Sequence, residues 1–209
     1  MEKEKETRKK LLECGKREFI EKGYQGASLR NICKAAGVTT GALYFFFKNK
    51  EELFEEVVRE PLQVLDKTIR MHFDEELKAD ITDVKPGDLK DDYQAAVDIV
   101  KALFRYRDEY LLVINNSHGS RYEDYKDRYV DSVYDHYLFL FCKMKGYENV
   151  DMASREDRFI VHWMTHDQFD IFIHMMTHCK DEEEALKQVE NMFNYMVGGW
   201  FAAIKKQPL

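Results

Sequence analysis

Helix-breaking residues are scarce in this chain, and that scarcity constrains its fold more than any other feature. Only three prolines (Pro61, Pro86 and Pro208) and ten glycines occur among 209 residues. Chains built from many short strands need frequent turns, whereas long helices need few. Apolar residues make up 44% of the chain and aromatic residues 13%, which is enough for a sizeable core and too much for a disordered chain. We therefore predict an all-α fold of about nine helices.

Neither a membrane span nor a disulfide framework is predicted. The longest apolar run, Tyr137 to Cys142, has six residues, whereas a spanning helix needs about 20. Five of the first six residues are charged, and this segment lacks the apolar stretch of a signal peptide. Four cysteines occur without a C-x-x-C pair, at Cys14, Cys33, Cys142 and Cys179. We expect reduced, mostly buried thiols and a cytoplasmic location.

Charge is unevenly distributed along the chain. Residues 1–50 carry twelve Lys or Arg and six Glu, a net charge of +6. Residues 51–209 carry 20 basic and 33 acidic side chains, a net charge of −13. A basic segment on an acidic remainder favours contact between that segment and a polyanion. The alternative is an uneven surface charge without a binding function.

The basic segment has the pattern of three short helices. A first helix is predicted over residues 7–22, with Gly15 on its inner face, where the absent side chain lets another helix approach closely. Gly23 is suited to end this helix. Ser28 and Thr39 are predicted to cap two further helices.

These two helices, over residues 29–36 and 40–47, are joined by a tight turn at Gly37. A supporting helix followed by two helices with a glycine turn is typical of a helix-turn-helix. A small helical bundle without DNA binding is the alternative.

The remaining chain is also predicted to be helical. The expected helices cover residues 50–77, 93–107, 109–115, 121–145, 155–179 and 181–204, with a loop over residues 79–92. Pro61 is expected to kink or break the first of them. The last two are rich in apolar residues, and a self-associating pair forming a symmetric four-helix interface is the economical explanation.

Several short motifs in the basic segment resemble the TetR (tetracycline-repressor) family of bacterial transcription regulators. They are Glu21-Lys22-Gly23-Tyr24, Ala36-Gly37-Val38, Gly41-Ala42-Leu43-Tyr44 and Phe47-Lys48-Asn49-Lys50-Glu51-Glu52-Leu53. The resemblance implies a helix-turn-helix DNA-binding domain over residues 1–50 and a ligand-binding and dimerisation domain over residues 51–209. It further implies a homodimer, formed through helices 155–179 and 181–204, that represses transcription from a palindromic operator. A small-molecule effector would release the DNA.

Family resemblance and side-chain chemistry together give candidate DNA-binding residues: Ser28, Arg30, Thr39, Thr40, Gly41, Ala42, Tyr44, Phe45 and Lys50. The resemblance places Tyr44 against the DNA backbone or a base, and Lys50 against a phosphate. Arg30 is a candidate for a guanine contact, and the capping residues Ser28 and Thr39 are candidate phosphate donors. For each, a packing or solvated role is the alternative. Family members often carry a polar aromatic where this chain has Phe46, so we leave the operator sequence open.

Aromatic residues and one methionine of the remaining chain are candidates for lining a ligand cavity: Tyr106, Tyr110, Tyr122, Tyr125, Phe139, Trp163, Met164 and Phe169. Ordinary core packing is the alternative for each. The acidic composition favours a cationic or neutral apolar effector.

Polar residues recur every four positions in an otherwise apolar helix: His162, His166, Asp170, His174 and His178. Histidines at i and i+4 have metal-ligand spacing, so a metal-responsive sensor is an alternative function, as is a thiol-responsive one. Hydrogen-bonded interface histidines are the simpler interpretation, and no cofactor is predicted. Because the sequence lacks recognisable catalytic motifs, an enzyme is the least favoured alternative.

Overall fold

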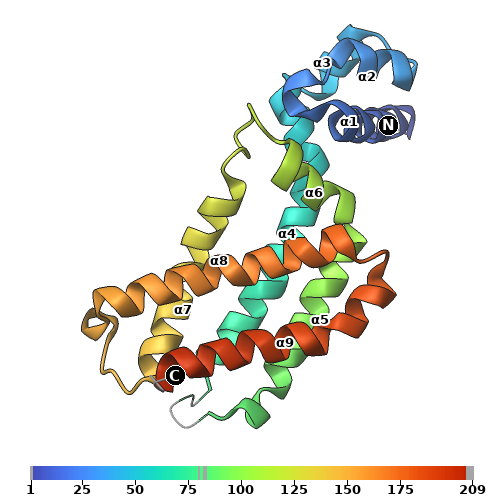
Figure 1. The fold of residues 1–209 in the computed structure, drawn as a ribbon. Helices are drawn as coiled ribbons and strands as arrows, with labels where there is room; N and C mark the ends of the chain where they lie inside the picture. The colour runs from blue at the N-terminus through green and yellow to red at the C-terminus, as the bar shows by residue number, and fades with distance from the viewer. Residues whose placement is uncertain (1, 80, 82–83, 206–209) are drawn as a thin grey trace. The chain divides into compact units, whose positions relative to one another are not determined.

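The computed structural model describes residues 2–79, 81 and 84–205, and all regular structure in these ranges is helical (Figure 1). This confirms the predicted all-α fold. The α-helices are α1 (Glu2–Gly26), α2 (Leu29–Ala36), α3 (Thr40–Phe46), α4 (Lys50–Glu76), α5 (Lys90–Arg105), α6 (Arg107–Asn116), α7 (Tyr125–Met144), α8 (Arg155–His178) and α9 (Glu182–Lys205). Two short 3-10 helices are η1 (Pro86–Asp88) and η2 (Val150–Met152). None of the described helices is both long and apolar enough to cross a membrane.

The chain divides into two compact units. Unit 1 comprises Met1–Val64 and Tyr106–Lys126, and unit 2 comprises Leu65–Arg105 and Asp127–Leu209. Two helices, α4 and α7, contribute residues to both units. Unit 1 thus includes the whole basic segment together with the first half of α4 and all of α6. The predicted functional boundary after residue 50 stays a prediction.

Aromatic packing forms the core of unit 1. Phe19 and Phe54 are fully buried and meet edge to face, with ring centroids 5.0 Å apart. Tyr24 packs edge to face on Phe54 at 5.2 Å. A Cβ built on Gly15 would lie 3.3 Å from the Leu53 side chain, which confirms that this glycine permits close approach of α1 and α4. Burying such large apolar side chains stabilises a unit by about 2–3 kcal/mol each.

Two backbone expectations in unit 1 had different outcomes. Gly23 has φ 69° and ψ 167°, so the regular helix ends there although hydrogen bonds continue to Gly26. The predicted end of the first helix is confirmed. Pro61, in contrast, does not break α4, which continues from Lys50 to Glu76. The Pro61 carbonyl also accepts a 2.6 Å hydrogen bond from the buried Tyr110 hydroxyl.

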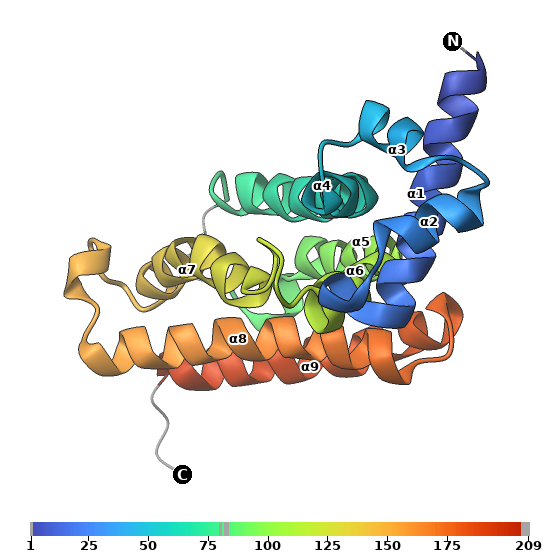
Figure 2. The same cartoon turned by 90° about the horizontal axis from the view of Figure 1, so that it is seen from above.

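Unit 2 packs α5, α8 and α9 around a small apolar core. Ala96 and Val100 of α5 meet Met175 of α8 and Val189 and Met192 of α9. A second cluster joins α7 to α8 through Phe141 and Val161. Helices α8 and α9 run side by side in both views (Figures 1 and 2).

Part of this helix pair lacks a covering layer within the described residues. Phe159 and Trp163 of α8 are 73% and 57% exposed, and Tyr195 of α9 is 61% exposed. A Cβ built on Gly198 or Gly199 would meet no described atom within 4 Å. An apolar face of this kind on two long helices is available for association.

Candidate nucleic-acid interface and ligand cavity

Side-chain caps begin both helices of the helix-turn-helix. Ser28 Oγ accepts from the backbone N–H of Asn31 at 3.5 Å, and Thr39 Oγ1 accepts from that of Ala42 at 3.2 Å. Both caps were predicted and are confirmed. Glu18 of α1 accepts from the Ser28 backbone N–H at 3.1 Å, which ties the start of α2 to α1. The N-terminal ends of α2 and α3 therefore have fixed directions.

The turn between the two helices depends on one glycine. Gly37 lies in the left-handed region, at φ 68° and ψ 32°, and its N–H donates to the end of α2. The following Val38 N–H donates to the Cys33 carbonyl at 3.0 Å. A left-handed residue followed by such a bond is a common helix C-terminal motif that favours glycine. It turns the chain sharply into α3.

Two aromatic side chains of α3 project into solvent. Tyr44 is 54% exposed and Phe45 is 72% exposed, whereas Leu43 beside them is fully buried. Arg30, Thr40 and Gly41 are also exposed. Exposed aromatic rings on a short helix of a basic module are unexplained by packing, since the core of unit 1 is filled by other residues. This surface has the chemistry to contact DNA bases and phosphates.

Lys50, the first residue of α4, is only half-exposed. Its Nζ donates to the carbonyls of Gln25 at 3.2 Å and Ala27 at 3.3 Å, and it lies 4.6 Å from the centre of the Tyr24 ring. The Tyr24 hydroxyl donates to Glu51 at 2.7 Å, and burial together with this carboxylate raises the pKa of Tyr24. Lys50 therefore has a structural role at the end of α1, and its phosphate contact stays a prediction. Lys34 and Lys48 are exposed basic residues of the same module that sequence reasoning did not select.

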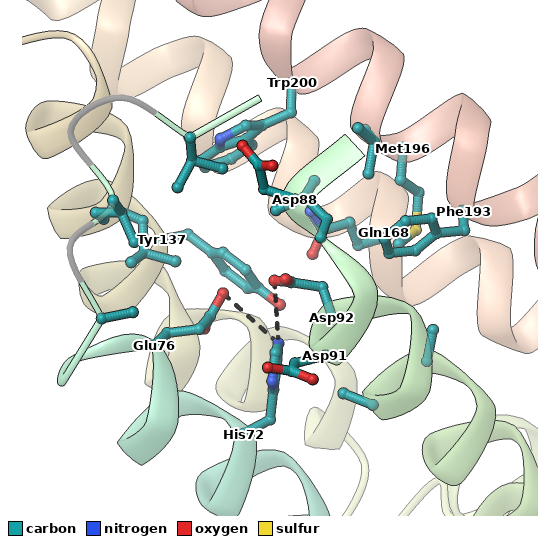
Figure 3. Close-up of a pocket in the computed structure, with 18 of the residues that line it drawn as sticks. His72, Glu76, Asp88, Asp91, Asp92, Tyr137, Gln168, Phe193, Met196 and Trp200 are labelled. Carbon is teal, nitrogen blue, oxygen red and sulfur yellow. Dashed lines mark ion pairs between the residues drawn. The ribbon is translucent and has the colours of Figure 1, made fainter. Parts of the chain in front are cut away.

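Unit 2 contains a cavity of about 280 Å³. Its apolar lining includes Phe172, Phe193, Met196 and Trp200, and its carboxylates are Glu75, Glu76, Asp88, Asp91 and Asp92. Glu76, Asp91 and Asp92 are drawn around His72 at one end of the cavity (Figure 3). None of the described lining residues is Lys or Arg.

None of the eight residues predicted to line a ligand cavity borders this one: Tyr106, Tyr110, Tyr122, Tyr125, Phe139, Trp163, Met164 and Phe169. The four tyrosines belong to unit 1, where the Tyr106 hydroxyl donates to Glu60 and Tyr122 packs on Phe54. In unit 2, Trp163 is 57% exposed and Phe169 packs on Tyr129. Aromatic content alone did not reveal which helix faces meet at the cavity.

His72 lies between two carboxylates at the acidic end of the cavity. Its Nε2 is 3.5 Å from Glu76 Oε1 and 3.6 Å from Asp92 Oδ1 (Figure 3). The pKa of Asp92 is raised, mainly by burial and secondly by the nearby Glu76 carboxylate. Burial and these two carboxylates also raise the pKa of Tyr137, so its hydroxyl stays protonated. In Figure 3 this hydroxyl points toward His72 and Asp92.

The sequence held a partial signal for this group. His72 and Glu76 have the i, i+4 spacing of residues on one helical face, while Asp92 lies 16 positions further, beyond a loop. Within the described parts of the chain, these are the only His, Cys, Asp or Glu residues gathered as a group that could hold a metal ion. The predicted histidine stripe forms two ring pairs instead: His162–His166, with centroids 4.7 Å apart, and His174–His178, at 4.0 Å.

All four cysteine thiols are buried and outside disulfides, as predicted. Burial raises the pKa of the Cys33 and Cys142 thiols. Because the thiolate is the reactive form, this environment does not favour a thiol-responsive sensor.

Comparison with known proteins assigns the N-terminal module. The family model described as bacterial regulatory proteins, tetR family, matches residues 11–57. The regulator AcrR of Shigella flexneri is 48% identical over 52 residues, which are 25% of this chain and 24% of that protein. The regulator TtgR of Pseudomonas putida is 41% identical over 54 residues, 26% of each chain. The chain thus matches about a quarter of the length of these relatives.

Solved structures resemble the chain over nearly its whole length. NalD of Pseudomonas aeruginosa, the secondary repressor of the MexAB-OprM multidrug efflux pump, superposes with a TM-score of 0.58 at 19% identity and covers 95% of this chain and 98% of its own. A transcriptional regulator from Aquifex aeolicus gives 0.52 at 19% identity, with 92% and 96% covered. At such identity the likeness shows the fold alone. The tetR family of bacterial regulatory proteins is thus matched by residues 11–57, and the solved structures add a similar fold for the rest of the chain.

Proposed function

We propose that this protein is a dimeric transcriptional repressor that binds a palindromic operator and releases it when a small-molecule effector enters the unit 2 cavity. Residues 1–50 are the proposed DNA-binding domain, and residues 51–209 the ligand-binding and dimerisation domain. A regulator with this role acts in the cytoplasm and is not an enzyme. The observation that carries the proposal is the exposure of Tyr44 and Phe45 on α3, in a module that the family comparison assigns.

Each proposed DNA contact has a physical role. Ser28 and Thr39 begin helices whose N-terminal N–H groups attract phosphate. Gly41 and Ala42, which carry little or no side chain, let the backbone approach the major groove closely. Tyr44, Phe45, Arg30 and Thr40 supply the hydroxyl, apolar and guanidinium groups that distinguish base edges. Lys50 supplies a positive charge.

Dimerisation is supported by the uncovered face of α8 and α9. Phe159, Trp163 and Tyr195 expose aromatic surface there, and Gly198 and Gly199 leave room for a partner helix. A twofold dimer through this face would present two recognition helices to two half-sites. Native mass spectrometry of the full chain, of 24.9 kDa, tests it. Replacing Trp163 by Glu is expected to convert the dimer to monomer, and a monomeric wild-type protein would overturn this part.

Effector release requires that the effector bind better to the conformation with low operator affinity. Helix α4 is the proposed lever because it starts with Lys50 and carries His72 and Glu76 of the cavity near its other end.

The test of DNA binding is selection from random duplexes followed by titration at several salt concentrations. Wild-type protein is expected to enrich a palindrome. Lys50→Ala should weaken binding to all sequences alike and reduce the slope of log K against log salt by about one unit. Lys67→Ala, which changes an exposed lysine of α4 in unit 2, serves as the matched control. Failure to enrich any sequence would overturn the proposed function.

A further inference from the structure

We propose that His72, Glu76 and Asp92 bind one divalent first-row transition metal ion, and that the effector is this ion or a molecule that chelates it. The effector role rests on the proposed function, whereas the metal site rests on geometry. His72 and Glu76 lie one turn apart on α4, and Asp92 lies in the first turn of α5. One ligand atom of each lies within 4.8 Å of the other two.

The distances around His72 fit an ion better than direct hydrogen bonds. Charge-assisted hydrogen bonds between nitrogen and oxygen measure about 2.7–2.9 Å. The two distances from His72 Nε2 are 3.5 Å and 3.6 Å. Two ligands of a tetrahedral ion with bonds of about 2.0–2.2 Å are about 3.3–3.6 Å apart. The distances from His72 to the two carboxylates therefore fit ligands that share a central cation.

An organic ammonium group is the competing occupant. Its nitrogen would lie about 2.8 Å from each acceptor, and tetrahedral geometry then separates the acceptors by about 4.6 Å. The measured separations of 3.5 Å and 3.6 Å are too short for that arrangement. They favour the smaller metal ion.

Charge in the cavity favours a dication. Its lining has two half-buried carboxylates, Glu76 and Asp92, and three exposed ones, and the described lining includes no Lys or Arg. The imidazole of His72 narrows the choice of metal, because nitrogen ligands suit Zn²⁺, Co²⁺ and Ni²⁺ whereas Mg²⁺ and Ca²⁺ prefer oxygen. Three protein ligands leave a coordination position for water or an effector atom.

A second residue layer holds Glu76 in place. His136 Nε2 lies 2.7 Å from Glu76 Oε2, the carboxylate oxygen that does not face His72. Phe73 stacks on the His136 ring, with centroids 3.7 Å apart and planes 13° apart. Outer partners of this kind fix the direction of a metal ligand.

The test is titration of the chelator-treated full-length protein with Co²⁺ and Zn²⁺, followed by calorimetry and by the visible absorption of bound Co²⁺. One ion per chain is expected, with Mg²⁺ binding much more weakly. His72→Gln and Asp92→Asn should each weaken binding by more than about 100-fold, because outer partners alone are worth about 10–100-fold. His136→Gln should cost about 10-fold. Melting curves without metal identify any variant that fails to fold. If His72→Gln fails to fold, the near-isosteric Asp92→Asn still tests the metal site.

A double variant, His162→Gln with His166→Gln, is the matched control because it removes an i, i+4 histidine pair outside the cavity. It should bind Co²⁺ like wild type. No binding by wild type, or binding lost in the control and kept in His72→Gln, would overturn the inference.

DNA binding is measured separately, in chelator and with Zn²⁺. Operator binding that does not respond to Zn²⁺, in protein that binds no metal, would refute the inference and leave the proposed function intact. Metal binding without enrichment of any DNA sequence would refute the proposed function and leave the metal site intact. Lower operator affinity with Zn²⁺ in wild type, but not in His72→Gln, would support both.

Discussion

Unit 1 and unit 2 place their charged and aromatic groups in opposite ways. Unit 1 fills its core with rings such as Phe19 and Phe54 and exposes others, Tyr44 and Phe45, on α3. Unit 2 gathers carboxylates with Phe172 and Phe193 around a cavity. Under the proposed function, unit 1 binds DNA on an outer surface, whereas unit 2 takes up the effector in its cavity. Four predictions test this contrast, from the largest expected effect to the smallest.

Removing an aromatic ring from the core of unit 1 should lower the free energy of unfolding more than removing one from the cavity of unit 2. Phe54→Ala removes a fully buried ring and should lower the free energy of unfolding by about 4 kcal/mol. Phe172→Ala removes a half-buried ring beside existing empty space and should cost about half as much. Urea unfolding followed by circular dichroism measures both. Equal losses would show that unit 2 packs as tightly as unit 1.

One buried carboxylate of unit 2 lies outside the cavity and has several charged and polar partners. Asp157 is 4% exposed, pairs with Lys145, and accepts from the Tyr147 hydroxyl at 3.1 Å and the Ser154 N–H at 3.0 Å. Burial disfavours its charge, but these partners prevail and lower its pKa to about 2.

This pairing makes stability depend on pH. Because the folded pKa is below the unfolded value of about 3.9, the stabilisation is fully present above about pH 5 and is lost as pH falls toward 2. Asp157→Asn should therefore cost about 2 kcal/mol at pH 7 and much less at pH 2. Unfolding curves across that range measure the difference, and a loss independent of pH would assign the effect to packing.

The exposed aromatic surface of unit 1 should matter for DNA and not for folding. Tyr44→Ala should weaken operator binding about 10-fold, from loss of one hydrogen bond and ring contact, and leave the melting temperature within about 2 °C. Met152→Ala, at a similarly exposed apolar side chain of unit 2 outside the proposed dimer face, is the control for operator binding. Fluorescence anisotropy with labelled DNA measures affinity. A large fall in melting temperature for Tyr44→Ala would indicate a packing role.

The smallest effect is expected at the start of α3. Thr39→Ala removes the cap on Ala42 and should lower stability by about 1 kcal/mol. Thr40→Ala, one position along, should change it by less than about 0.5 kcal/mol. Thermal unfolding measures the stability of both variants, and the difference between them is the contribution of the cap. Equal losses of stability would contradict a capping role for Thr39.

Much of the structure of unit 1 could be predicted from local sequence patterns. The caps at Ser28 and Thr39 and the turn at Gly37 depend on residues within four positions of each other, so the sequence predicted them directly. The cavity depends instead on which faces of five separate helices meet. His72 and Asp92 come together only through the packing of α4 and α5, and no periodicity along the chain encodes that pairing. Pro61 shows a further limit, because α4 continues through this residue although a proline inside a helix favours a kink or break.

The buried thiols divide evenly between the units, with Cys14 and Cys33 in unit 1 and Cys142 and Cys179 in unit 2. A buried thiol reacts with an alkylating reagent only when the structure around it opens. Labelling rates at the four positions, read by mass spectrometry, therefore report how often each unit opens, without any engineered probe. Adding DNA should slow labelling of Cys14 and Cys33, and adding an effector should slow labelling of Cys142 and Cys179. The natural cysteines would therefore report the two binding events separately.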